Sequence, residues 1–405
     1  MNRKYTVIDL FSGCGGFSQG FLKEGFEILA ANEIWQPAIE TYKFNHKNTI
    51  MIEGDITNPE IKKKLYESIK DKKINVVIGG PPCQAYSSAG NRNPDDPRGQ
   101  LYLDFIEIID HIKPDFFVME NVKGLINMKH VRPSLTKNEL KEFKESCKLL
   151  QRYKDLKRYG AQRKLTRQES NEFRELKSSH KELEKKINHY LIPLIDKILI
   201  KFNDINYNVI WKVLNSANYG VAQFRERVIF IGTKNERINL QFPPITHSGN
   251  GKLVSNTKNE NKSKNQNLRN WIPVKQVLKQ YENWEENPQL NHLFTRHSKE
   301  FIKRLSKVPI GENLYKNYND AWWRLDPEKP ARTVKENHGG VFIHYKFDRV
   351  CTPRELAALQ SFSDDFIFKG TKSAILKQIG NAVPPLMAKA IARQIKNHLD
   401  EIYLK

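Results

Sequence analysis

Cys83 stands in the stretch Gly79-Gly80-Pro81-Pro82-Cys83-Gln84, directly after the apolar run 74–78. The run predicts a buried parallel strand, and the prolines end it because proline cannot extend a sheet ladder. Open α/β sheets bind their ligands at the carboxyl ends of their strands. A cysteine taken at random is more often a small buried thiol. A thiol held at a strand end on a stiff turn is, however, a candidate nucleophile for covalent catalysis.

Two other polar groups are predicted near the same edge. Glu120 follows the strand expected at 115–119, which should lie beside the cysteine strand. Gln223, Arg225 and Arg227 alternate just before a strand expected at 228–232, so alternation places them on one side, toward a common ligand. Surface arginines are usually solubilising. Polar residues aimed one way beside a catalytic edge indicate positioning of an anion or a substrate.

The elements that must position these groups begin at the amino terminus. A first strand is expected at 5–11, followed by the glycine-rich turn Ser12-Gly13-Cys14-Gly15-Gly16 and a helix from Gln19. Glycines let the backbone approach a ligand, and a helix N-terminus attracts negative charge. The spacing is not Gly-x-Gly-x-x-Gly, so a dinucleotide site is the weaker interpretation.

Acidic residues end the next two predicted strands. Glu33 follows the strand expected at 26–31, where a carboxylate can accept hydrogen bonds from both ribose hydroxyls. Asp55 follows the strand expected at 49–52 and could accept from an adenine amino group beside apolar Ile56. Each carboxylate alone is more often a solvated loop residue. Together at successive strand ends, they indicate an adenosine-containing ligand.

Composition restricts the class of protein. The chain has 405 residues, no long apolar run, and an amino terminus without the apolar core of a signal peptide. Its four cysteines are far apart and match neither a zinc site nor a disulfide framework, as suits a reduced cytosol. The net charge of +21 favours a polyanionic partner over mere solubility, although charge cannot distinguish DNA from RNA.

Three segments interrupt or extend the α/β pattern. Residues 84–99 have the composition of a mobile loop. Residues 129–186 predict a helical hairpin with capping boxes at Thr136/Glu139 and Thr166/Glu169 and a turn at Gly160. Its 18 Lys or Arg against 9 Asp or Glu give a net charge of +9, which fits either a solvated face or contact with flanking nucleic acid.

Residues 233–329 lose the α/β rhythm and interleave basic and aromatic side chains. With 17 Lys or Arg against 10 Asp or Glu, the segment carries a net charge of +7. It predicts a smaller, irregular recognition domain, with an ordinary small core as the alternative use of its aromatics. The chain then returns to the first domain through Arg332-Thr333-Val334, a helix beginning near Thr352, and Gly380-Asn381-Ala382-Val383-Pro384-Pro385 before a last helix at 386–399.

Taken together, these motifs resemble those of the cytosine-C5 DNA methyltransferases. The resemblance rests on Asp9–Gly16, Pro81-Pro82-Cys83, Glu120-Asn121-Val122, Gln223-Phe224-Arg225-Glu226-Arg227, Arg332-Thr333-Val334 with its helix, and the Gly380–Pro385 run. One such motif alone would be weak evidence, but they occur in the family's order and cover nearly the whole catalytic part.

The resemblance implies an α/β fold. It consists of a Rossmann-like S-adenosylmethionine-dependent methyltransferase sheet with a smaller, irregular target-recognition domain and a helical-hairpin insertion. The implied domains are 1–232 for catalysis and cofactor binding, with the insertion at about 129–186, then 233–329 for target recognition, and 330–405 as the segment that completes the catalytic domain.

The resemblance also implies the site residues. Cys83, Glu120, Arg225 and Arg227 would be catalytic, and Gln84, Ser87, Arg98 and Gln223 would contact DNA. S-adenosylmethionine, leaving as S-adenosylhomocysteine, would be bound without any metal. Its site would comprise Phe11, Ser12, Gly13, Gly15, Gly16, Glu33, Ile34, Asp55, Ile56, Pro81, Leu101, Asn381 and Val383. Ala222, Ile34 and the long 129–186 segment depart from the family pattern, which affects cofactor affinity and the hairpin's role but removes no catalytic group.

The implied reaction adds the Cys83 thiolate to C6 of a flipped-out cytosine, so that C5 can accept a methyl group. Double-stranded DNA is the expected substrate of a cytoplasmic, nucleoid-associated bacterial monomer whose functional partner is a restriction endonuclease. Two alternatives remain open: a tRNA cytosine-C5 methyltransferase with the same catalytic residues, and a catalytically inactive DNA-binding regulator. A nicotinamide oxidoreductase fits the fold but neither the nucleophile nor the glycine spacing.

Overall fold

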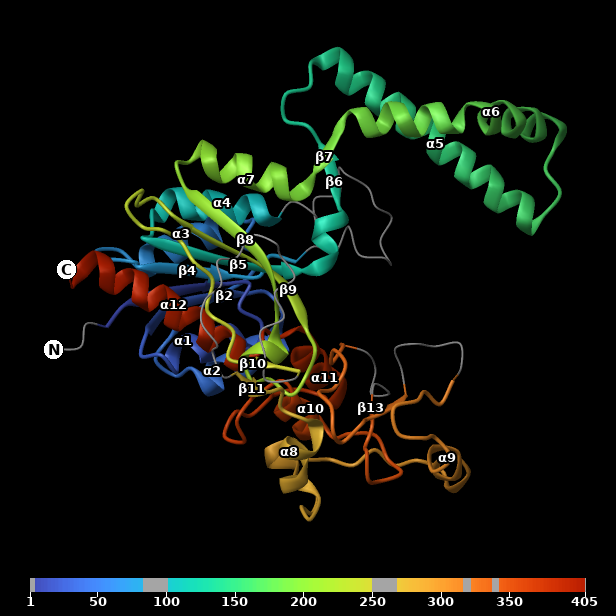
Figure 1. The fold of residues 1–405 in the computed structure, drawn as a ribbon. Helices are drawn as coiled ribbons and strands as arrows, with labels where there is room; N and C mark the ends of the chain where they lie inside the picture. The colour runs from blue at the N-terminus through green and yellow to red at the C-terminus, as the bar shows by residue number, and fades with distance from the viewer. Residues whose placement is uncertain (1–3, 83–100, 250–267, 316–321, 337–341, 405) are drawn as a thin grey trace. The chain divides into compact units, whose positions relative to one another are not determined.

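The computed structural model describes residues 4–82, 101–249, 268–315, 322–336 and 342–404 (Figure 1). The chain divides into two units. Within the described ranges, the first contains residues 4–82, 101–123 and 206–404, and the second contains residues 124–205. Residues 233–329 therefore belong to the same unit as the sheet and the return segment. Among the described residues, no helix is both long enough and apolar enough to cross a membrane.

A seven-stranded sheet with the order β3-β2-β1-β4-β5-β9-β8 forms the centre of the first unit. β1 to β5 run parallel, and β9 pairs antiparallel with both β5 and β8. All four residues of β4 are buried, as expected of a parallel strand covered on both faces. The predicted α/β sheet is confirmed. Its strands are β1 (Thr6–Leu10), β2 (Glu27–Glu33), β3 (Ile50–Glu53), β4 (Val76–Gly79), β5 (Phe116–Val122), β8 (Asn208–Asn215) and β9 (Glu226–Thr233).

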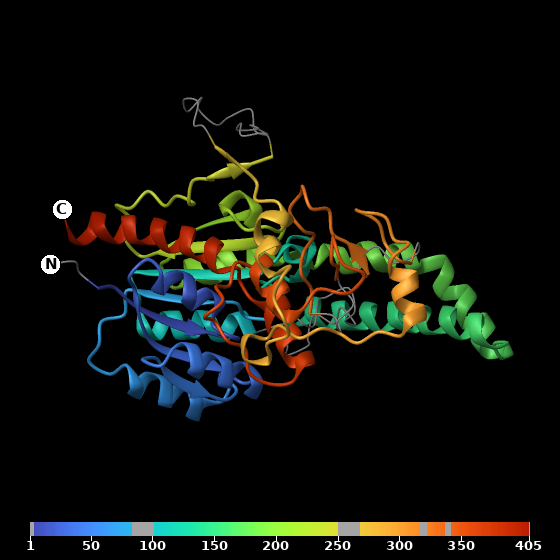
Figure 2. The same ribbon diagram turned by 90° about the horizontal axis from the view of Figure 1, so that it is seen from below.

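The first and last helices of the unit, α1 (Gly16–Leu22) and α12 (Pro385–Tyr403), cover one face of this sheet (Figures 1 and 2). Met387, Ile391 and Ile395 recur every four residues on α12, and all three are fully buried. They share one hydrophobic cluster with Phe21 of α1 and Val76 of β4. The end of the chain thus completes the core that the first strands begin.

Helix α4 (Leu101–Ile112) packs on the opposite face. Phe105 meets the ring of Phe117 on β5 edge to face, with centroids 6.0 Å apart. α3 (Pro59–Ser68) is joined to α4 through Lys62, whose Nζ lies 2.9 Å from an Asp104 oxygen. α2 (Gln36–Asn45) packs beside β2 and β3. Helices on both faces of the sheet leave its carboxyl edge as the place for a site.

A second hydrophobic cluster unites the irregular segment with the return segment. Tyr281 and Val274 pack in it with Val334, Leu356 and Phe362. Several of the predicted recognition aromatics therefore serve as ordinary core. The remaining elements of this unit are η4 (Ser216–Tyr219), β10 (His247–Ser248), β11 (Arg269–Asn270), α8 (Val274–Leu278), η5 (Lys279–Tyr281), η6 (Pro288–Leu290), α9 (Lys299–Leu305), β12 (Trp323–Arg324), β13 (Phe342–Ile343), α10 (Pro353–Leu359) and α11 (Lys372–Asn381).

The second unit contains the predicted helical hairpin, formed by α5 (Lys137–Gln162) and α6 (Arg167–His189). Both predicted capping boxes are present, at Thr136 and at Thr166. An antiparallel pair, β6 (Lys129–Val131) and β7 (Leu191–Pro193), closes its base. The 3-10 helix η3 (Lys123–Asn127) precedes the hairpin, and α7 (Leu194–Asp204) follows it.

Some of the helix, turn and strand boundaries that the sequence predicted were wrong. Gly160 lies inside α5, because a single glycine is tolerated in a helix, and the turn comes only before the Thr166 cap. β5 continues through Glu120 to Val122, because the antiparallel neighbour β9 supplies hydrogen-bonding partners as far as Arg227. Gly380 and Asn381 end helix α11, which the sequence analysis did not predict.

Candidate active site at the carboxyl edge of the sheet

The strand that leads to Cys83 ends beside Glu120. Gly79 of β4 pairs with Met119 of β5, so the next residues of the two strands continue side by side. The buried Asn121 side chain donates a hydrogen bond from Nδ2 to the Pro81 carbonyl at 3.0 Å. β5 therefore holds the proline turn in place. The predicted residues Cys83, Gln84, Ser87 and Arg98 lie outside the described residues.

Glu120 forms an ion pair with Arg227. The Arg227 Nε lies 2.8 Å from Glu120 Oε1, and the two side chains are 13% and 12% exposed. The other carboxylate oxygen faces the backbone of β4: a Cβ added at Gly80 would lie 3.1 Å from Oε2. The carboxylate is thus fixed between a guanidinium and the strand end, while a fraction of it stays accessible to a ligand.

The side chains of Gln223 and Arg225, unlike that of Arg227, do not point toward Glu120. Gln223 is fully buried; its amide donates 2.8 Å to Gln360 Oε1 and accepts 2.7 Å from the Val334 backbone N–H. Arg225 donates to the carbonyl oxygens of Val334 and Gly380 at 3.0 and 2.7 Å. The prediction that all three polar residues face a common ligand was wrong, because the return segment covers two of them.

Burial has an electrostatic consequence for Arg225. Desolvation, with the nearby charge of Arg227, holds the pKa of its guanidinium well below the usual range, while Glu120 acts in the opposite sense. Both terminal nitrogens are engaged by main-chain carbonyls. The side chain therefore joins the 223–227 stretch to the return segment, and Arg227 is the member of the motif that reaches Glu120.

A cavity of about 390 Å³ lies at Arg227. Lys123, Arg227 and Arg332 bring three cationic side chains to its wall, against one carboxylate, Glu226, which pairs with Lys123 at 2.8 Å. The Arg332 guanidinium stacks over the Trp323 ring, 3.3 Å from its centroid. A basic hollow with aromatic support fits a phosphate-bearing ligand. The remaining lining residues are Asn215, Phe224 and Thr333.

The Glu33 carboxylate ties the turn after β1 to the end of β2 by accepting hydrogen bonds from backbone N–H groups. The Gly13 N–H donates to Glu33 Oε2 at 2.8 Å, and Glu33 Oε1 accepts from the N–H groups of Ile34 and Trp35 at 2.9 Å each. Phe11 and Gly13 both have φ of +54°, a conformation that brings the turn over the sheet edge. The Ser12 hydroxyl points inward to the Asn32 carbonyl.

The glycines of this turn differ in what surrounds them. A Cβ at Gly13 would meet no atom within 4 Å among the described residues, so space remains there for a ligand. At Gly15 it would lie 2.2 Å from His46 Nε2, and at Gly16 it would lie 2.5 Å from the Val383 carbonyl. Gly15 and Gly16 therefore lack side chains because the protein's own atoms occupy that space.

The other predicted cofactor residues gather along the strand ends. Ile34, next to Glu33, is 63% exposed, while Ile56 after β3 is buried. Asp55 is exposed and accepts from the Thr57 N–H at 2.9 Å. Exposed apolar surface beside a fixed carboxylate and an open glycine fits an adenosine group. Pro81 lies after β4, Leu101 begins α4, and Asn381 and Val383 come from the return segment, where Asn381 donates to Glu336 at 3.0 Å.

A buried chain of polar side chains lies below the turn and was not predicted from the sequence. Ser18 donates to Asp9 at 2.6 Å and lies 2.7 Å from the Tyr42 hydroxyl, and Tyr42 contacts the His46 ring with centroids 4.4 Å apart. Burial raises the pKa of Asp9 to about 7 and lowers the pKa of His46 to about 4. An aspartate within an apolar strand was the available signal for the chain.

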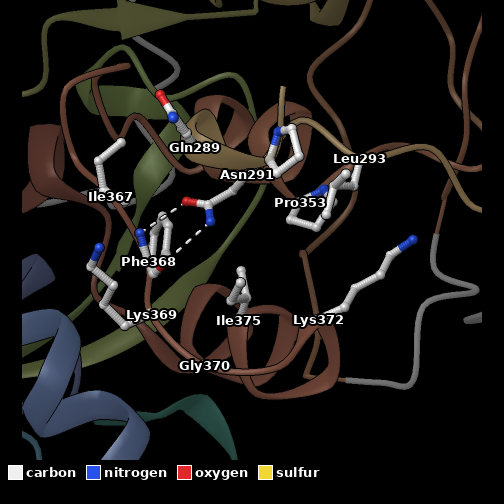
Figure 3. Close-up of a pocket in the computed structure, with 11 residues that line it drawn as sticks. Gln289, Asn291, Leu293, Pro353, Ile367, Phe368, Lys369, Gly370, Lys372 and Ile375 are labelled. Carbon is white, nitrogen blue, oxygen red and sulfur yellow. Dashed lines mark hydrogen bonds between the residues drawn. The ribbon is translucent and has the colours of Figure 1, made fainter. Parts of the chain in front are cut away.

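Elsewhere in the first unit, a cavity of about 270 Å³ contains none of the predicted site residues (Figure 3). Asn291 forms part of its wall, and its amide bonds both the N–H and the carbonyl of Phe368. Lys369 and Lys372 also line it. In the part of the chain that the structure describes, no group of His, Cys, Asp and Glu is placed to hold a metal ion.

The structure is an α/β fold that places a glycine-rich turn and a glutamate–arginine pair at the carboxyl edge of its parallel strands. The family described as C-5 cytosine-specific DNA methylase matches residues 5–154 and 181–397. The chain belongs to this family and is a cytosine-C5 DNA methyltransferase, as the motifs predicted. Members of the family generally depend on S-adenosylmethionine.

Two curated relatives align with this chain over nearly its full length. Type II methyltransferase M.DdeI of Desulfomicrobium norvegicum is 30% identical over 438 residues, which cover 98% of this chain and 90% of that protein. Type II methyltransferase M1.HphI of Haemophilus parahaemolyticus is 33% identical over 405 residues, which cover 96% and 86%.

Solved structures are similar in fold. A prophage-encoded E. coli protein described as a DNA modification methyltransferase has a TM-score of 0.62 at 24% identity, covering 98% of this chain and all of that one. S. pombe Dnmt2 methyltransferase has a TM-score of 0.54 at 14% identity, covering 99% of this chain and all of that one. At these identities the similarity establishes the fold alone.

Proposed function

We propose that this enzyme methylates C5 of a flipped-out cytosine within a specific double-stranded DNA sequence, through a covalent bond between Cys83 and C6. The observation that carries the proposal is the Glu120–Arg227 pair beside the strand that leads to Cys83. It brings an oriented carboxylate and a cation to the edge of the sheet at which the strand before Cys83 ends.

Each group has a chemical task. The Cys83 thiolate adds to C6 and makes C5 nucleophilic. Glu120 accepts a hydrogen bond from the amino group of the base, which distinguishes cytosine from thymine, and shares a proton taken from solvent with N3, which stabilises charge as the ring is attacked. Arg227 holds that carboxylate in place. After the methyl group is transferred, a base removes the C5 proton and the bond to Cys83 breaks, which restores the aromatic ring.

S-adenosylmethionine supplies the electrophilic methyl group. Glu33 would accept from the ribose through Oε2, the oxygen that receives the Gly13 N–H, while the exposed Ile34 would pack on the adenine and Asp55 and Ile56 would flank its edge. The open space at Gly13 would accommodate part of the S-adenosylmethionine molecule. Pro81, Leu101, Asn381 and Val383 complete the predicted pocket, with Phe11 and Ser12 from the turn. Gly15 and Gly16 contribute through their peptide groups only.

The DNA strand enters over basic side chains. The cavity at Lys123, Arg227 and Arg332 supports binding of the phosphates next to the flipped nucleotide. Extrusion of a base costs a few kcal/mol, which such contacts offset. Gln84, Ser87 and Arg98 stay predicted DNA contacts outside the described residues. Segment 233–329 is proposed to read the sequence through the groove.

The covalent step is tested with a duplex that contains 5-fluorocytosine at the target position. The wild-type enzyme with S-adenosylmethionine is expected to form an adduct that survives denaturing electrophoresis, because fluorine blocks the final proton removal. Cys83→Ser should form no adduct and transfer no methyl group while it still binds DNA. Undiminished turnover of Cys83→Ser would exclude the mechanism.

The substrate class is tested with tritiated S-adenosylmethionine on duplex DNA and on tRNA at equal concentration. We expect label in DNA, and label confined to tRNA would overturn the proposal. Bisulfite sequencing of DNA from cells that express the protein then identifies the target. By analogy with the Type II relatives, we propose that methylation protects this sequence from a cognate restriction endonuclease, and resistance of the DNA to cleavage tests that role.

A further inference from the structure

The positive charge of the α5–α6 hairpin is concentrated where the two helices join. Residues 148–168, here called the hairpin tip, contain eight Lys or Arg and one Asp, a net charge of +7. The rest of 129–186 contains ten Lys or Arg and eight Asp or Glu, a net charge of +2. Two carboxylates just beyond residue 168, Glu169 and Glu172, pair with Arg163 and Arg152 of the tip, so the cations that bear on a ligand are those without such a partner.

Most cations of the tip form no ion pair with the part of the chain that the structure describes. Arg152, Arg158 and Arg163 pair with carboxylates. The structure records no ion pair within the described chain for the five others. These are Lys148, Lys154, Lys157, Lys164 and Arg167, all exposed.

Arg167 is the clearest case. It is the first residue of α6, where the helix dipole disfavours a cation. Its presence there is therefore not explained by helix stability.

The tip also lies largely outside the residues that match the methylase family. The family match stops at residue 154 and resumes at 181, so it omits the end of α5 and the first half of α6. The features that define the common reaction lie outside this gap. A charged addition at this place is free to serve a purpose that the minimal enzyme lacks.

The hairpin is built to hold its tip away from its base. Tyr153 stacks on Phe173 with centroids 5.5 Å apart and an interplanar angle of 5°. Leu156 and Leu176 are buried, and the antiparallel pair of β6 and β7 closes the other end. At 1.5 Å per residue, the 26 residues of α5 span about 39 Å. That is the rise of roughly 11 base pairs of duplex.

We propose that the hairpin tip binds the phosphate backbone of duplex DNA outside the target site, without reading its sequence. The inference rests on the proposed function in so far as DNA is the substrate. Exposed lysines and arginines release counterions when they meet phosphates, and this favours any sequence equally. The contact would lengthen the stretch of DNA that the enzyme occupies.

An acidic protein fits the tip less well than DNA. Protein interfaces have an apolar core with aromatic anchors and few lysines. In the tip, Leu149 is the one exposed large apolar side chain, at 47%. A surface of cations without an apolar centre matches a polyanion instead.

The test measures binding of full-length protein to 12- and 40-base-pair duplexes of random sequence between 50 and 300 mM salt. The variant Lys154→Gln/Lys157→Gln/Lys164→Gln/Arg167→Gln removes four tip charges. We expect its affinity for the 40-base-pair duplex at 0.15 M salt to fall roughly ten- to hundredfold. The slope of log affinity against log salt should fall by about 2–4. Affinity for the short duplex should change much less.

A matched control removes four exposed charges from the balanced part of the same hairpin, as Lys141→Gln/Lys144→Gln/Lys177→Gln/Lys181→Gln. We expect its binding and salt slope to stay near wild type. The variant Lys154→Arg/Lys157→Arg/Lys164→Arg keeps the charge and should retain tight binding to the long duplex. Unchanged binding by the fourfold tip variant would overturn the proposal and leave the tip to an acidic protein partner.

This experiment is independent of methyl transfer. Random-sequence duplexes need contain no target, so a failure of the covalent mechanism would appear only in the 5-fluorocytosine assay. Loss of long-duplex affinity in an enzyme that forms no adduct would support the tip contact alone. An adduct-forming enzyme whose tip variant binds normally would support the catalytic proposal alone.

Discussion

The sheet edge and the hairpin tip both carry arginines and lysines, but they hold them in opposite ways. At the edge, Arg225 is buried and its terminal nitrogens bond two carbonyls, while Arg227 is paired with Glu120. At the tip, side chains such as Lys157 and Lys164 are exposed and have no carboxylate partner among the described residues. At the sheet edge each charged side chain has its own bonding partners. At the hairpin tip, several exposed charges lie together without such partners among the described residues.

The difference has an energetic basis. A buried charge must be matched by specific partners, so its removal leaves unsatisfied groups and costs much. Exposed charges interact weakly with one another across water and are screened by salt. We therefore expect single substitutions at the edge to have large effects, and substitutions at the tip to act only in sum and in the presence of a polyanion.

The largest effect on stability is expected from Arg225→Met. It leaves the buried carbonyl oxygens of Val334 and Gly380 without their donors, at a cost of about 3–5 kcal/mol in the free energy of unfolding. Urea denaturation followed by circular dichroism measures this loss. Arg227→Met is the matched control, because its side chain is partly exposed and its partner Glu120 keeps access to water. Equal losses from both variants would contradict the different roles assigned to the two arginines.

Glu120→Gln tests the catalytic half of the pair. A neutral amide can neither share an ionisable proton with N3 nor form an ion pair with Arg227, so we expect kcat/KM to fall about 10²- to 10³-fold with little loss of DNA binding. Single-turnover methyl transfer provides the measurement. If the two side chains act as a unit, the Glu120→Gln/Arg227→Met double variant should be hardly slower than the worse single variant. Fully additive losses would argue against a functional pair.

His46→Phe tests the buried chain below the glycine turn. Burial lowers the pKa of His46 from 6.5 to about 4. Between these pH values the unfolded state binds a proton on His46 that the folded state does not bind. Stability is therefore lost as the pH falls from about 6.5 toward 4, by about 2 kcal/mol at pH 5. The phenylalanine variant should lose less between pH 7.5 and pH 5 in thermal unfolding.

Asp9 has the opposite pH dependence, because its pKa is raised to about 7 and its contribution fades as the pH rises through that value. It is present in both the wild-type protein and the His46→Phe variant, so it does not affect their comparison. An identical acid loss in the two proteins would show that His46 is not held neutral in the folded state.

A smaller effect is expected from Gly80→Ala. The new Cβ would lie 3.1 Å from Glu120 Oε2, so the carboxylate must shift by a few tenths of an ångström. Activity should fall roughly tenfold, because catalytic groups tolerate little displacement. Gly160→Ala within α5 serves as the control, since its Cβ would meet Leu165 at an ordinary 3.5 Å. Full activity of Gly80→Ala would show that the carboxylate position is not limiting.

The fourfold tip variant should leave the unfolding temperature unchanged within error, because its side chains are exposed and unpaired. Differential scanning calorimetry without DNA checks this expectation. A marked loss of stability would blur the contrast between the two regions, since the tip charges would then have partners within the protein.

The sequence predicted the strands of the sheet, the capped hairpin and the family, because these depend on local patterns. Apolar runs, glycine turns and capping boxes each act over a few residues. The strands β1 to β5 accordingly begin and end within a few residues of their predicted bounds. Glu120 was also correctly expected beside the cysteine strand, because successive strands of an α/β chain are usually neighbours in the sheet. The extension of β5 through Glu120 was missed, because it depends on pairing with distant β9.

What the sequence alone determined is the set of chemical groups and the order in which the chain delivers them to the sheet edge. Only the tertiary structure decided which arginine of the Gln223–Arg227 motif faces Glu120, and which glycines stay open to a ligand. Alternation along a strand fixes two sides but does not say what covers each side. Here the return segment, more than a hundred residues later in the chain, covers Gln223 and Arg225 and leaves Arg227 at the site.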